Sequence, residues 1–174
     1  MPCVVAVVGR SKSGKTTFIV KLIGELASRG YKVAAVKHSE CGFDIDRPGK
    51  DTWLMSEAGA VAVAMASSGE LAVIKKHAGD PELKEVLEVL GGDFDIVLVE
   101  GYKKAPVPKV EIHRGELSDE LVSTVREGLI AVVTDSDLEM PVPKFSPGDA
   151  SEVADLIEEK FLKGARDGQF VRRL

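Results

Sequence analysis

The sequence predicts an α/β protein: a single doubly wound, mostly parallel sheet with helices on both faces. Short runs of β-branched residues alternate with segments whose apolar residues recur every three or four positions, the order expected of repeated β-α-β units. Aromatic residues make up only 5% of the 174 residues, and 44% are hydrophobic. The core is therefore expected to consist of Val, Ile, Leu and Ala, as in buried parallel strands.

The predicted strands are runs rich in Val, Ile, Leu and Ala that polar residues and glycines bound on either side. They span residues 3–8, 31–36, 60–66, 71–74, 96–100, 109–112 and 129–134. The third and fourth of these runs are separated by Ser67-Ser68-Gly69-Glu70, a sequence typical of a tight turn. This spacing favours a hairpin.

Helices are predicted where apolar residues share one face of a 3.6-residue repeat. In residues 16–28, Leu22 and Leu26 lie on such a face, and Gly30 is the expected cap at the carboxyl end. The other predicted helices span residues 50–58, 81–90, 118–126 and 148–162. The tail, residues 163–174, shows no periodicity, so the predicted domain covers residues 1–162.

The charge balance restricts the partners of the chain. With 23 basic and 28 acidic residues the formal net charge is −5, which argues against nucleic acid or a membrane surface as the main partner. Two cysteines are too few for a disulfide framework. Because cysteine is scarce, a protein of the reducing cytoplasm is expected. No stretch approaches the roughly 20 apolar residues of a membrane span.

Residues 9–16 read Gly-Arg-Ser-Lys-Ser-Gly-Lys-Thr. This octapeptide matches the phosphate-loop (P-loop) pattern G-x-x-x-x-G-K-[ST], and it stands between a predicted strand and a predicted helix, as the pattern requires. Backbone N–H groups of such a loop surround phosphate oxygens at a helix N-terminus. Lys15 would neutralise the β- and γ-phosphates, and the Thr16 hydroxyl would ligate Mg²⁺. The predicted nucleotide-binding residues of the loop are Gly9, Ser11, Ser13, Gly14, Lys15 and Thr16. We therefore expect residues 1–162 to form a P-loop nucleotide-binding domain.

An acidic residue ends the predicted strand 96–100. Glu100 stands where the Walker B element of P-loop proteins usually has Asp. Its extra methylene group favours a role in positioning water or in the outer shell of the metal, and Gly101 keeps this end of the strand open to the phosphates. The alternative is a glutamate that simply ends a strand at the surface.

The polar loop of residues 37–52 leaves the same sheet edge as the P-loop and is expected to close over a magnesium–nucleotide complex. Asp46 and Asp51 are candidate ligands of the metal or of a water molecule. Lys37 and Lys50 are candidate phosphate contacts. For each of the four, a solvated loop charge is the alternative interpretation.

The Asn-Lys-x-Asp motif that reads guanine in many GTPases is absent, and residues 132–137 take its place after a predicted strand. Asp135 or Asp137 would accept hydrogen bonds from guanine N1 and N2. An aspartate that forms a turn is the alternative.

Several segments outside the P-loop occur together in a pattern that is more specific than the P-loop itself. They are Lys37-His38, residues 43–52 (Phe-Asp-Ile-Asp-Arg-Pro-Gly-Lys-Asp-Thr), Ala58-Gly59-Ala60, Val99-Glu100-Gly101-Tyr102-Lys103 and residues 108–114 (Pro-Lys-Val-Glu-Ile-His-Arg). With these segments the chain resembles the molybdopterin-guanine dinucleotide biosynthesis protein B (MobB) family from about residue 3 to residue 162.

The resemblance implies a homodimeric protein that binds GTP and Mg²⁺, has weak GTPase activity and assists a MobA-like guanylyltransferase in attaching GMP to molybdopterin. It implies that Asp46 and Glu100 organise the metal and the attacking water. It also implies that the phosphates and Mg²⁺ bind to Gly9, Gly14, Lys15, Thr16 and Thr17.

A second anion, such as the phosphate of molybdopterin, is a candidate ligand of Lys109, His113 and Arg114. The alternative is a polar strand edge without a ligand.

Two other functions remain open at this point. A small-molecule kinase or ligase of the dethiobiotin-synthetase type also combines a P-loop with Glu-Gly at a strand end, but the chain shows no arginine-rich lid. A metal-delivery adaptor whose nucleotide only switches its affinity for a partner is the other alternative.

Overall fold

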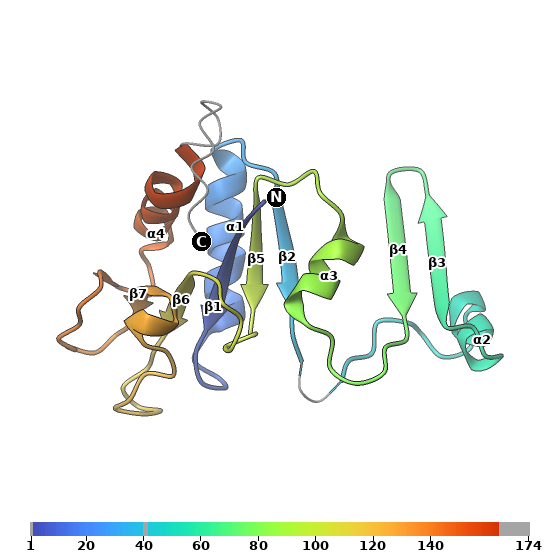
Figure 1. The fold of residues 1–174 in the computed structure, drawn as a ribbon, viewed down its shortest axis with the longest axis horizontal. Helices are drawn as coiled ribbons and strands as arrows, with labels where there is room; N and C mark the ends of the chain where they lie inside the picture. Colours follow the sequence, from blue (N-terminus) through green and yellow to red (C-terminus); the bar gives the residue numbers. More distant parts are fainter. Residues whose placement is uncertain (1, 40–41, 164–174) are drawn as a thin grey trace. The chain divides into compact units, whose positions relative to one another are not determined.

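A computed structural model describes residues 2–39 and 42–163, which fall into two compact units (Figure 1). The described parts of Met1–His38 and Gly91–Leu174 form one unit, here called the sheet unit, and residues Ser39–Leu90 form the other, the inserted unit. A compact unit is defined by its own contacts and not by independent folding, so the predicted domain over residues 1–162 stays a prediction. Of the predicted tail, residues 164–174 lie outside the described residues.

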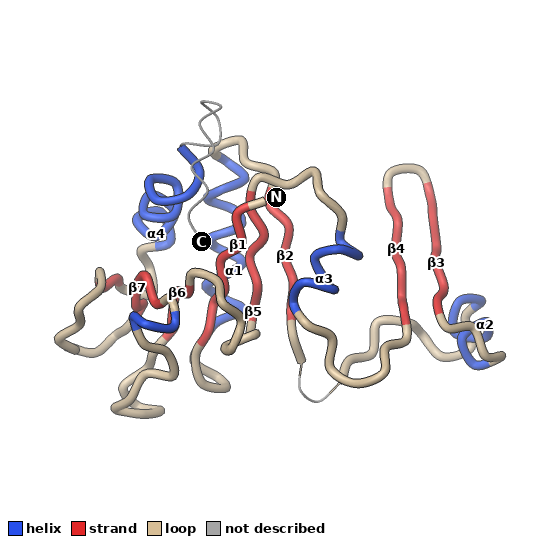
Figure 2. The backbone as a smooth tube through the Cα atoms, viewed as in Figure 1, coloured by secondary structure: helices blue, strands red, loops and turns tan. Residues whose placement is uncertain are grey.

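The sheet unit contains a sheet of six strands in the order β2-β5-β1-β6-β7-β8, and every neighbouring pair is parallel. Figure 2 shows strands in red. The prediction of a mostly parallel α/β sheet is therefore confirmed. The P-loop strand β1 lies directly beside β5, the strand that ends at Glu100. The strands are β1 (Cys3–Val8), β2 (Val33–Lys37), β5 (Ile96–Glu100), β6 (Lys109–Ile112), β7 (Leu129–Val133) and β8 (Lys144–Phe145).

Two strands differ from their predicted positions. β2 was expected at residues 31–36 and is shifted toward the carboxyl end, so that Lys37 pairs with Glu100 in register. β8 was not predicted because its two residues are too few to show a hydrophobic period. It exists because β7 offers a free edge, with which Lys144 and Phe145 pair.

One face of the sheet packs against α1 (Lys15–Ser28) and α4 (Ala150–Ile157). Alternate residues of the central strands point toward these helices, as the two-residue period of a strand requires. Aliphatic side chains dominate this core, as the composition predicts. They include Val5, Val7, Leu22, Leu26, Ile96, Leu98, Val110, Ile112, Val153 and Ile157, all 1% exposed or less. Burial of this apolar surface is the main source of stability for the sheet unit.

A polar network holds the carboxyl end of α1 to α4. Arg29, the C-cap residue of α1, donates hydrogen bonds to Glu25, Asp155 and Glu158, and Tyr31 donates to Glu158 as well. Gly30 follows in the left-handed conformation, as the sequence predicts for a helix end. Beyond α4 the chain continues as the π-helix η2 (Glu158–Leu162), so the predicted helix 148–162 is confirmed in outline.

The opposite face of β6 carries two buried charged side chains instead of apolar ones. Lys109 donates to the backbone carbonyls of Ala105, Val107 and Glu127, and each of the two charged residues, Lys109 and Glu111, is 1% exposed. The Glu111 carboxylate accepts the N–H groups of Val122 and Ser123 at 2.6 and 2.9 Å. These contacts attach the segments before and after β6 to the sheet.

The predicted helix at residues 118–126 is wrong. The segment is irregular and ends in a short 3₁₀ turn, η1 (Val125–Glu127), whose N-cap Thr124 forms a capping box with Glu127. The buried Glu111 carboxylate accepts two of the backbone N–H groups of this segment. A polar side chain of the sheet therefore takes the place of the helical hydrogen bonds.

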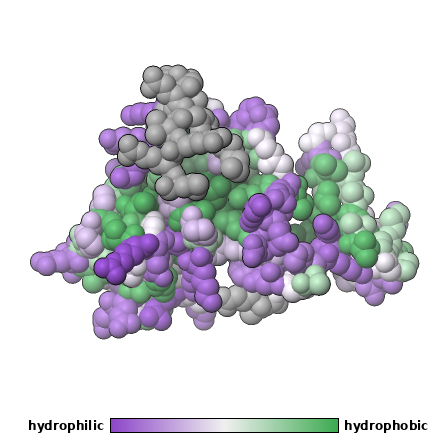
Figure 3. Space-filling view, viewed as in Figure 1, coloured by the Kyte–Doolittle hydropathy of each residue, from purple (hydrophilic) through white to green (hydrophobic). Residues whose placement is uncertain are grey.

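The inserted unit contains α2 (Asp51–Glu57), the antiparallel hairpin β3 (Ala62–Ser67) and β4 (Glu70–Lys75), and α3 (Leu83–Leu90). The predicted hairpin is confirmed, with Ser67 opposite Glu70 across the turn. Apolar side chains gather on the surface of this unit (Figure 3). No helix in residues 2–39 or 42–163 is long and apolar enough to cross a membrane.

Candidate nucleotide-binding site

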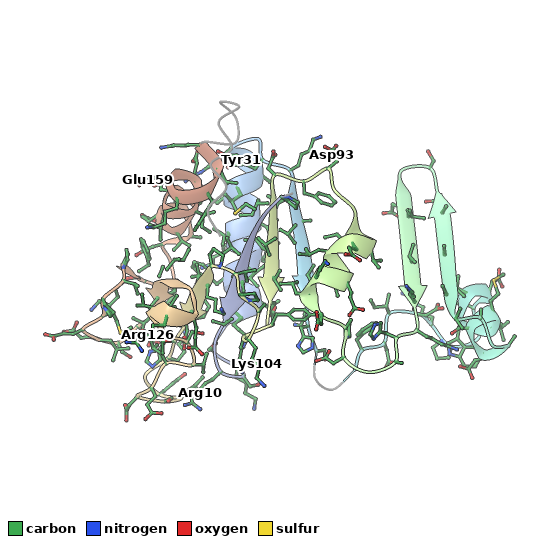
Figure 4. The ribbon with its side chains drawn as sticks, viewed as in Figure 1. Arg10, Tyr31, Asp93, Lys104, Arg126 and Glu159 are labelled. Atoms are coloured by element: carbon green, nitrogen blue, oxygen red, sulfur yellow. The ribbon has the colours of Figure 1, made fainter. Side chains whose placement is uncertain are left out.

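The P-loop connects β1 to α1 at the carboxyl edge of the sheet, where ligands of parallel α/β sheets bind. Gly9, Lys12 and Gly14 have positive φ angles of 145°, 65° and 93°. A Cβ atom on Gly9 would collide with the carbonyl oxygen of Ile112, so the loop lies directly against the end of β6. Arg10, in the loop, lies at the opposite end of the sheet unit from Tyr31 and Asp93 (Figure 4).

One polar side chain of the P-loop, that of Ser13, is buried. The Ser13 side chain is 2% exposed, and among the described residues its hydroxyl has no hydrogen-bond partner. A buried hydroxyl without a partner costs free energy unless a ligand or water binds it. Together with the left-handed glycines and the start of α1, this hydroxyl fits a loop shaped to bind phosphate. Ser11, Thr16 and Thr17 are exposed at the same place.

Lys15 is the first residue of α1, and its ammonium group lies against the P-loop backbone. Its Nζ donates to the carbonyl oxygen of Arg10 at 2.7 Å. Burial lowers the pKa of Lys15 below its ordinary value, Glu100 opposes this change, and Lys103 and Lys37 lower the pKa further. Three ammonium groups therefore share this edge of the sheet with one carboxylate, an arrangement suited to a polyphosphate.

Thr16 and Glu100 meet beside Lys15. The Thr16 hydroxyl donates to Oε2 of Glu100 at 2.8 Å, and Nζ of Lys37 lies 3.3 Å from Oε1 of Glu100 and 3.4 Å from Oγ1 of Thr16. A hydroxyl and a carboxylate are hard oxygen donors of the kind Mg²⁺ prefers, so this pair fits that metal. The structure thus brings together two of the three predicted metal ligands.

The end of β5 is shaped by two residues with left-handed backbone. Gly101 (φ 99°) donates its N–H to the carbonyl oxygen of Val7, and Tyr102 (φ 49°) follows. The Tyr102 ring packs on the His38 ring with centroids 4.5 Å apart. A non-glycine residue with positive φ stores strain, and such residues concentrate at functional sites. Sequence reasoning did not identify this ring pair, because Tyr102 follows β5 while His38 follows β2.

Arg114 contacts the P-loop, which was not predicted from the sequence. Its Nε donates to the carbonyl oxygen of Ser13 and its Nη1 to Oδ2 of Asp135, both at 3.2 Å. The guanidinium therefore connects the residue after β6 to the P-loop and to the segment after β7. No sequence pattern identified this contact, because its three residues are far apart in the chain.

The expectation that Lys109, His113 and Arg114 form a second anion site is wrong in this structure. Lys109 is buried with its ammonium on backbone carbonyls. His113 is 4% exposed, and its ring nitrogens lie 2.9 Å from Oγ1 of Thr134 and 2.7 Å from the carbonyl oxygen of Ser118. Side chains of a strand point alternately to its two faces, so Lys109 and His113 lie on the same packed face of the sheet and not in solvent.

Asp135 lies after β7, as predicted, and both of its carboxylate oxygens have partners. Oδ2 accepts from Arg114, and Oδ1 accepts the N–H of Gly115 at 3.3 Å. Burial raises the pKa of Asp135, but the Gly115 N–H and the Arg114 guanidinium outweigh it and hold that pKa below its ordinary value. Contact with guanine stays a prediction for this residue.

Asp46 belongs to the inserted unit. Its Oδ1 accepts the N–H of Arg47 at 2.8 Å and the hydroxyl of Thr52 at 3.0 Å, so it stabilises the turn that precedes α2. The metal role of Asp46 stays a prediction. Within residues 2–39 and 42–163, no group of three or more His, Cys, Asp or Glu side chains is arranged to hold a metal ion by itself.

Comparison with known proteins identifies relatives that cover most of the chain. Residues 4–135 match the model of a protein family described as MobB, molybdopterin guanine dinucleotide synthesis protein B. Two relatives are each described as a molybdopterin-guanine dinucleotide biosynthesis adapter protein. The one from Haemophilus influenzae is 35% identical over 87% of this chain and 85% of its own, and the one from Escherichia coli is 32% identical over 88% and 90%.

Solved structures show the same fold. The crystal structure of Bacillus subtilis MobB matches with a TM-score of 0.72 at 30% identity, covering 92% of this chain and 98% of that one. A MobB homologue from Bacillus stearothermophilus matches with a TM-score of 0.68 at 29% identity, covering 91% and 97%. The similarity therefore extends beyond the P-loop to nearly the full length of both chains.

Proposed function

This chain belongs to the MobB family, and from that premise we propose that it is a nucleotide-binding adapter in molybdopterin-guanine dinucleotide biosynthesis. In this proposal it binds GTP and Mg²⁺ and assists a MobA-like guanylyltransferase that attaches GMP to molybdopterin. The names of the relatives support the pathway and the adapter role. The nucleotide, the metal and the partner rest on the geometry of the site and on the resemblance.

The observation that carries the proposal is the P-loop with the Thr16–Glu100 pair beside it. The phosphates would bind to the backbone of Gly9, Ser11, Ser13 and Gly14 and to the side chains of Lys15, Thr16 and Thr17. Thr16 and Glu100 would hold Mg²⁺, and the metal role of Asp46 stays a prediction from the sequence. When bound, the metal would supply positive charge to the phosphate oxygens.

We propose that hydrolysis of GTP is slow. Glu100 would position the attacking water, but its carboxylate would at the same time hold Mg²⁺ together with Thr16. In P-loop enzymes most of the rate enhancement comes from positioning the reactants and from stabilising charge in the transition state. A cation supplied by a partner protein raises the hydrolysis rate by several orders of magnitude. Slow turnover in the isolated protein suits an adapter whose work takes place on another enzyme.

We propose a homodimer with the hairpin of the inserted unit at its interface. Leu71 and Val73 share one face of the hairpin and are 72% and 51% exposed. Apolar side chains that cluster on a two-stranded hairpin gain stability when a second chain covers them. Sedimentation of the protein and of a Leu71→Lys variant would test this, since the variant is expected to sediment as a monomer.

The central experiment is a titration with fluorescent GTP and ATP in the presence of Mg²⁺. We expect GTP to bind more tightly than ATP. Lys15→Ala is expected to weaken GTP binding by about 100-fold with little change in the circular dichroism spectrum, whereas Lys21→Ala, on an exposed position of the same helix, is expected to bind normally. A preference for ATP, or near-normal affinity of Lys15→Ala, would contradict the proposal.

A second experiment tests the adapter role. The affinity of the protein for a MobA-like guanylyltransferase is measured by calorimetry in the presence of GDP and of a non-hydrolysable GTP analogue. We expect binding in at least one nucleotide state. A folded, nucleotide-binding protein without affinity for the transferase in either state would contradict the partner assignment.

A further inference from the structure

Lys37 occupies an unusual position at the edge of the sheet. As the last residue of β2 it pairs in register with Glu100, the last residue of β5, so the two side chains emerge side by side at the carboxyl edge. Its Nζ lies 3.3 Å from Oε1 of Glu100 and 3.4 Å from Oγ1 of Thr16. These are the same two groups that the proposed function assigns to Mg²⁺.

We propose that the Lys37 ammonium is a built-in counter-ion at the metal position, which Mg²⁺ displaces when the magnesium–nucleotide complex forms. The inference rests on the proposed nucleotide and metal site and adds a role that the P-loop pattern does not contain. An ammonium ion and Mg²⁺ are both hard cations that bind to oxygen ligands. Without the metal, the ammonium provides the charge that the carboxylate of Glu100 requires.

The exposure of the two side chains suits this exchange. The Glu100 side chain is 13% exposed, so its carboxylate is held in a partly desolvated place where an unpaired charge is costly. The Lys37 side chain is 61% exposed, and its flexible stem lets the ammonium leave without moving the backbone of β2. The carboxylate is thus fixed while its counter-ion is free to move.

The two cations cannot share the carboxylate, because Mg²⁺ between Thr16 and Glu100 would repel an ammonium group within about 4 Å. Lys15 and Lys103 are further positive charges at the same edge. The displaced ammonium of Lys37 would therefore turn toward the only new anion at this edge, the bound phosphates.

This arrangement gives Lys37 opposite effects with and without metal. In the absence of Mg²⁺, the ammonium neutralises Glu100 and reduces its repulsion of the phosphates. In the presence of Mg²⁺, the ammonium competes with the metal for Glu100 and Thr16. Removing the ammonium is therefore expected to weaken metal-free nucleotide binding and, at the same time, to lower the Mg²⁺ concentration that binding requires.

The test measures the affinity for fluorescent GDP, which is not hydrolysed, across a range of Mg²⁺ concentrations and in EDTA. For Lys37→Met we expect the Mg²⁺ midpoint to fall about fivefold and the affinity in EDTA to fall about tenfold. Lys32→Met is the matched control, because Lys32 just precedes β2 and pairs with the exposed Asp93. The control is expected to behave as wild type.

A double-mutant cycle with Glu100→Gln separates this role from a general loss of positive charge. In the Glu100→Gln background, Lys37→Met is expected to change the Mg²⁺ midpoint by less than about twofold, because the counter-ion has lost its partner. Equal loss of affinity at every Mg²⁺ concentration would show a plain phosphate contact and overturn the inference. An unchanged midpoint in Lys37→Met would also overturn it.

The outcomes distinguish the inference from the proposed function. A folded wild-type protein that binds neither GTP nor GDP overturns both. A wild-type protein that binds GTP with Mg²⁺, together with a Lys37→Met variant of normal Mg²⁺ dependence, overturns the counter-ion alone.

Discussion

The Nε atom of Arg114 donates to the carbonyl oxygen of Ser13 across 3.2 Å, so the residue that follows β6 holds the backbone of the P-loop. The same guanidinium is fixed by Asp135 after β7. A planar guanidinium that bonds two groups at once holds both in a defined geometry. The shape of the phosphate site therefore depends on two neighbouring strands as well as on the P-loop sequence.

Arg114→Ala is expected to weaken binding of GTP by about tenfold, since a loop that must be ordered by the ligand binds less tightly than a preformed one. Titration with fluorescent GTP measures this, with Arg126→Ala, at an exposed position, as the control. Asp135→Asn tests the predicted guanine contact. A loss confined to GTP would assign Asp135 to guanine, whereas an equal loss of GTP and ATP binding would assign it to holding Arg114.

Two glycine-to-alanine variants should have opposite effects. Gly9 has φ 145°, and a Cβ there would collide with the Ile112 carbonyl, so Gly9→Ala is expected to destabilise the protein by about 2–4 kcal/mol. Gly24 is exposed within α1 with no atom in the way, so Gly24→Ala should stabilise by about 0.5–1 kcal/mol. Urea unfolding measures both. Equal stability of the two variants would contradict the close packing of Gly9 on β6.

Glu111→Ala should destabilise the protein by about 2–4 kcal/mol, because the N–H groups of Val122 and Ser123 lose their buried acceptor. Hydrogen exchange of these two amides is expected to accelerate more than that of the β1 amides. The exposed Glu116, changed to alanine, serves as the control. If Glu111→Ala and Glu116→Ala unfold at the same urea concentration, the Glu111 contacts do not hold the segment.

The Cys3 thiol should be unreactive in the folded protein. Burial raises its pKa to about 12, so the thiolate that reacts with iodoacetamide at pH 8 is roughly a thousandfold rarer than in an unfolded chain. The measurement uses a Cys41→Ser background, so that Cys3 is the thiol observed. The rate should rise to that of a free thiol in urea. Rapid labelling of the native protein would show that the start of β1 is open.

Prediction from sequence succeeded where the signal is local and repeated. The strands at residues 3–8, 96–100 and 109–112 were predicted with the bounds that the structure shows, because consecutive aliphatic residues are typical of a buried parallel strand. The predicted helix 118–126 does not form, because a hydrogen-bond acceptor elsewhere in the chain binds backbone N–H groups of this segment. Glu111, on β6, binds its N–H groups.

The α/β class, the P-loop between β1 and α1, and Glu100 at the end of a strand could all be predicted from the sequence, because each follows from patterns within single strands, loops and helices and from their order. Which polar residues meet at the carboxyl edge depends on how the strands are arranged. Strand order and register placed Lys37 beside Glu100 and brought Arg114 to Ser13, while they buried Lys109 and His113. Such contacts join residues far apart in the chain, and no local pattern encodes them.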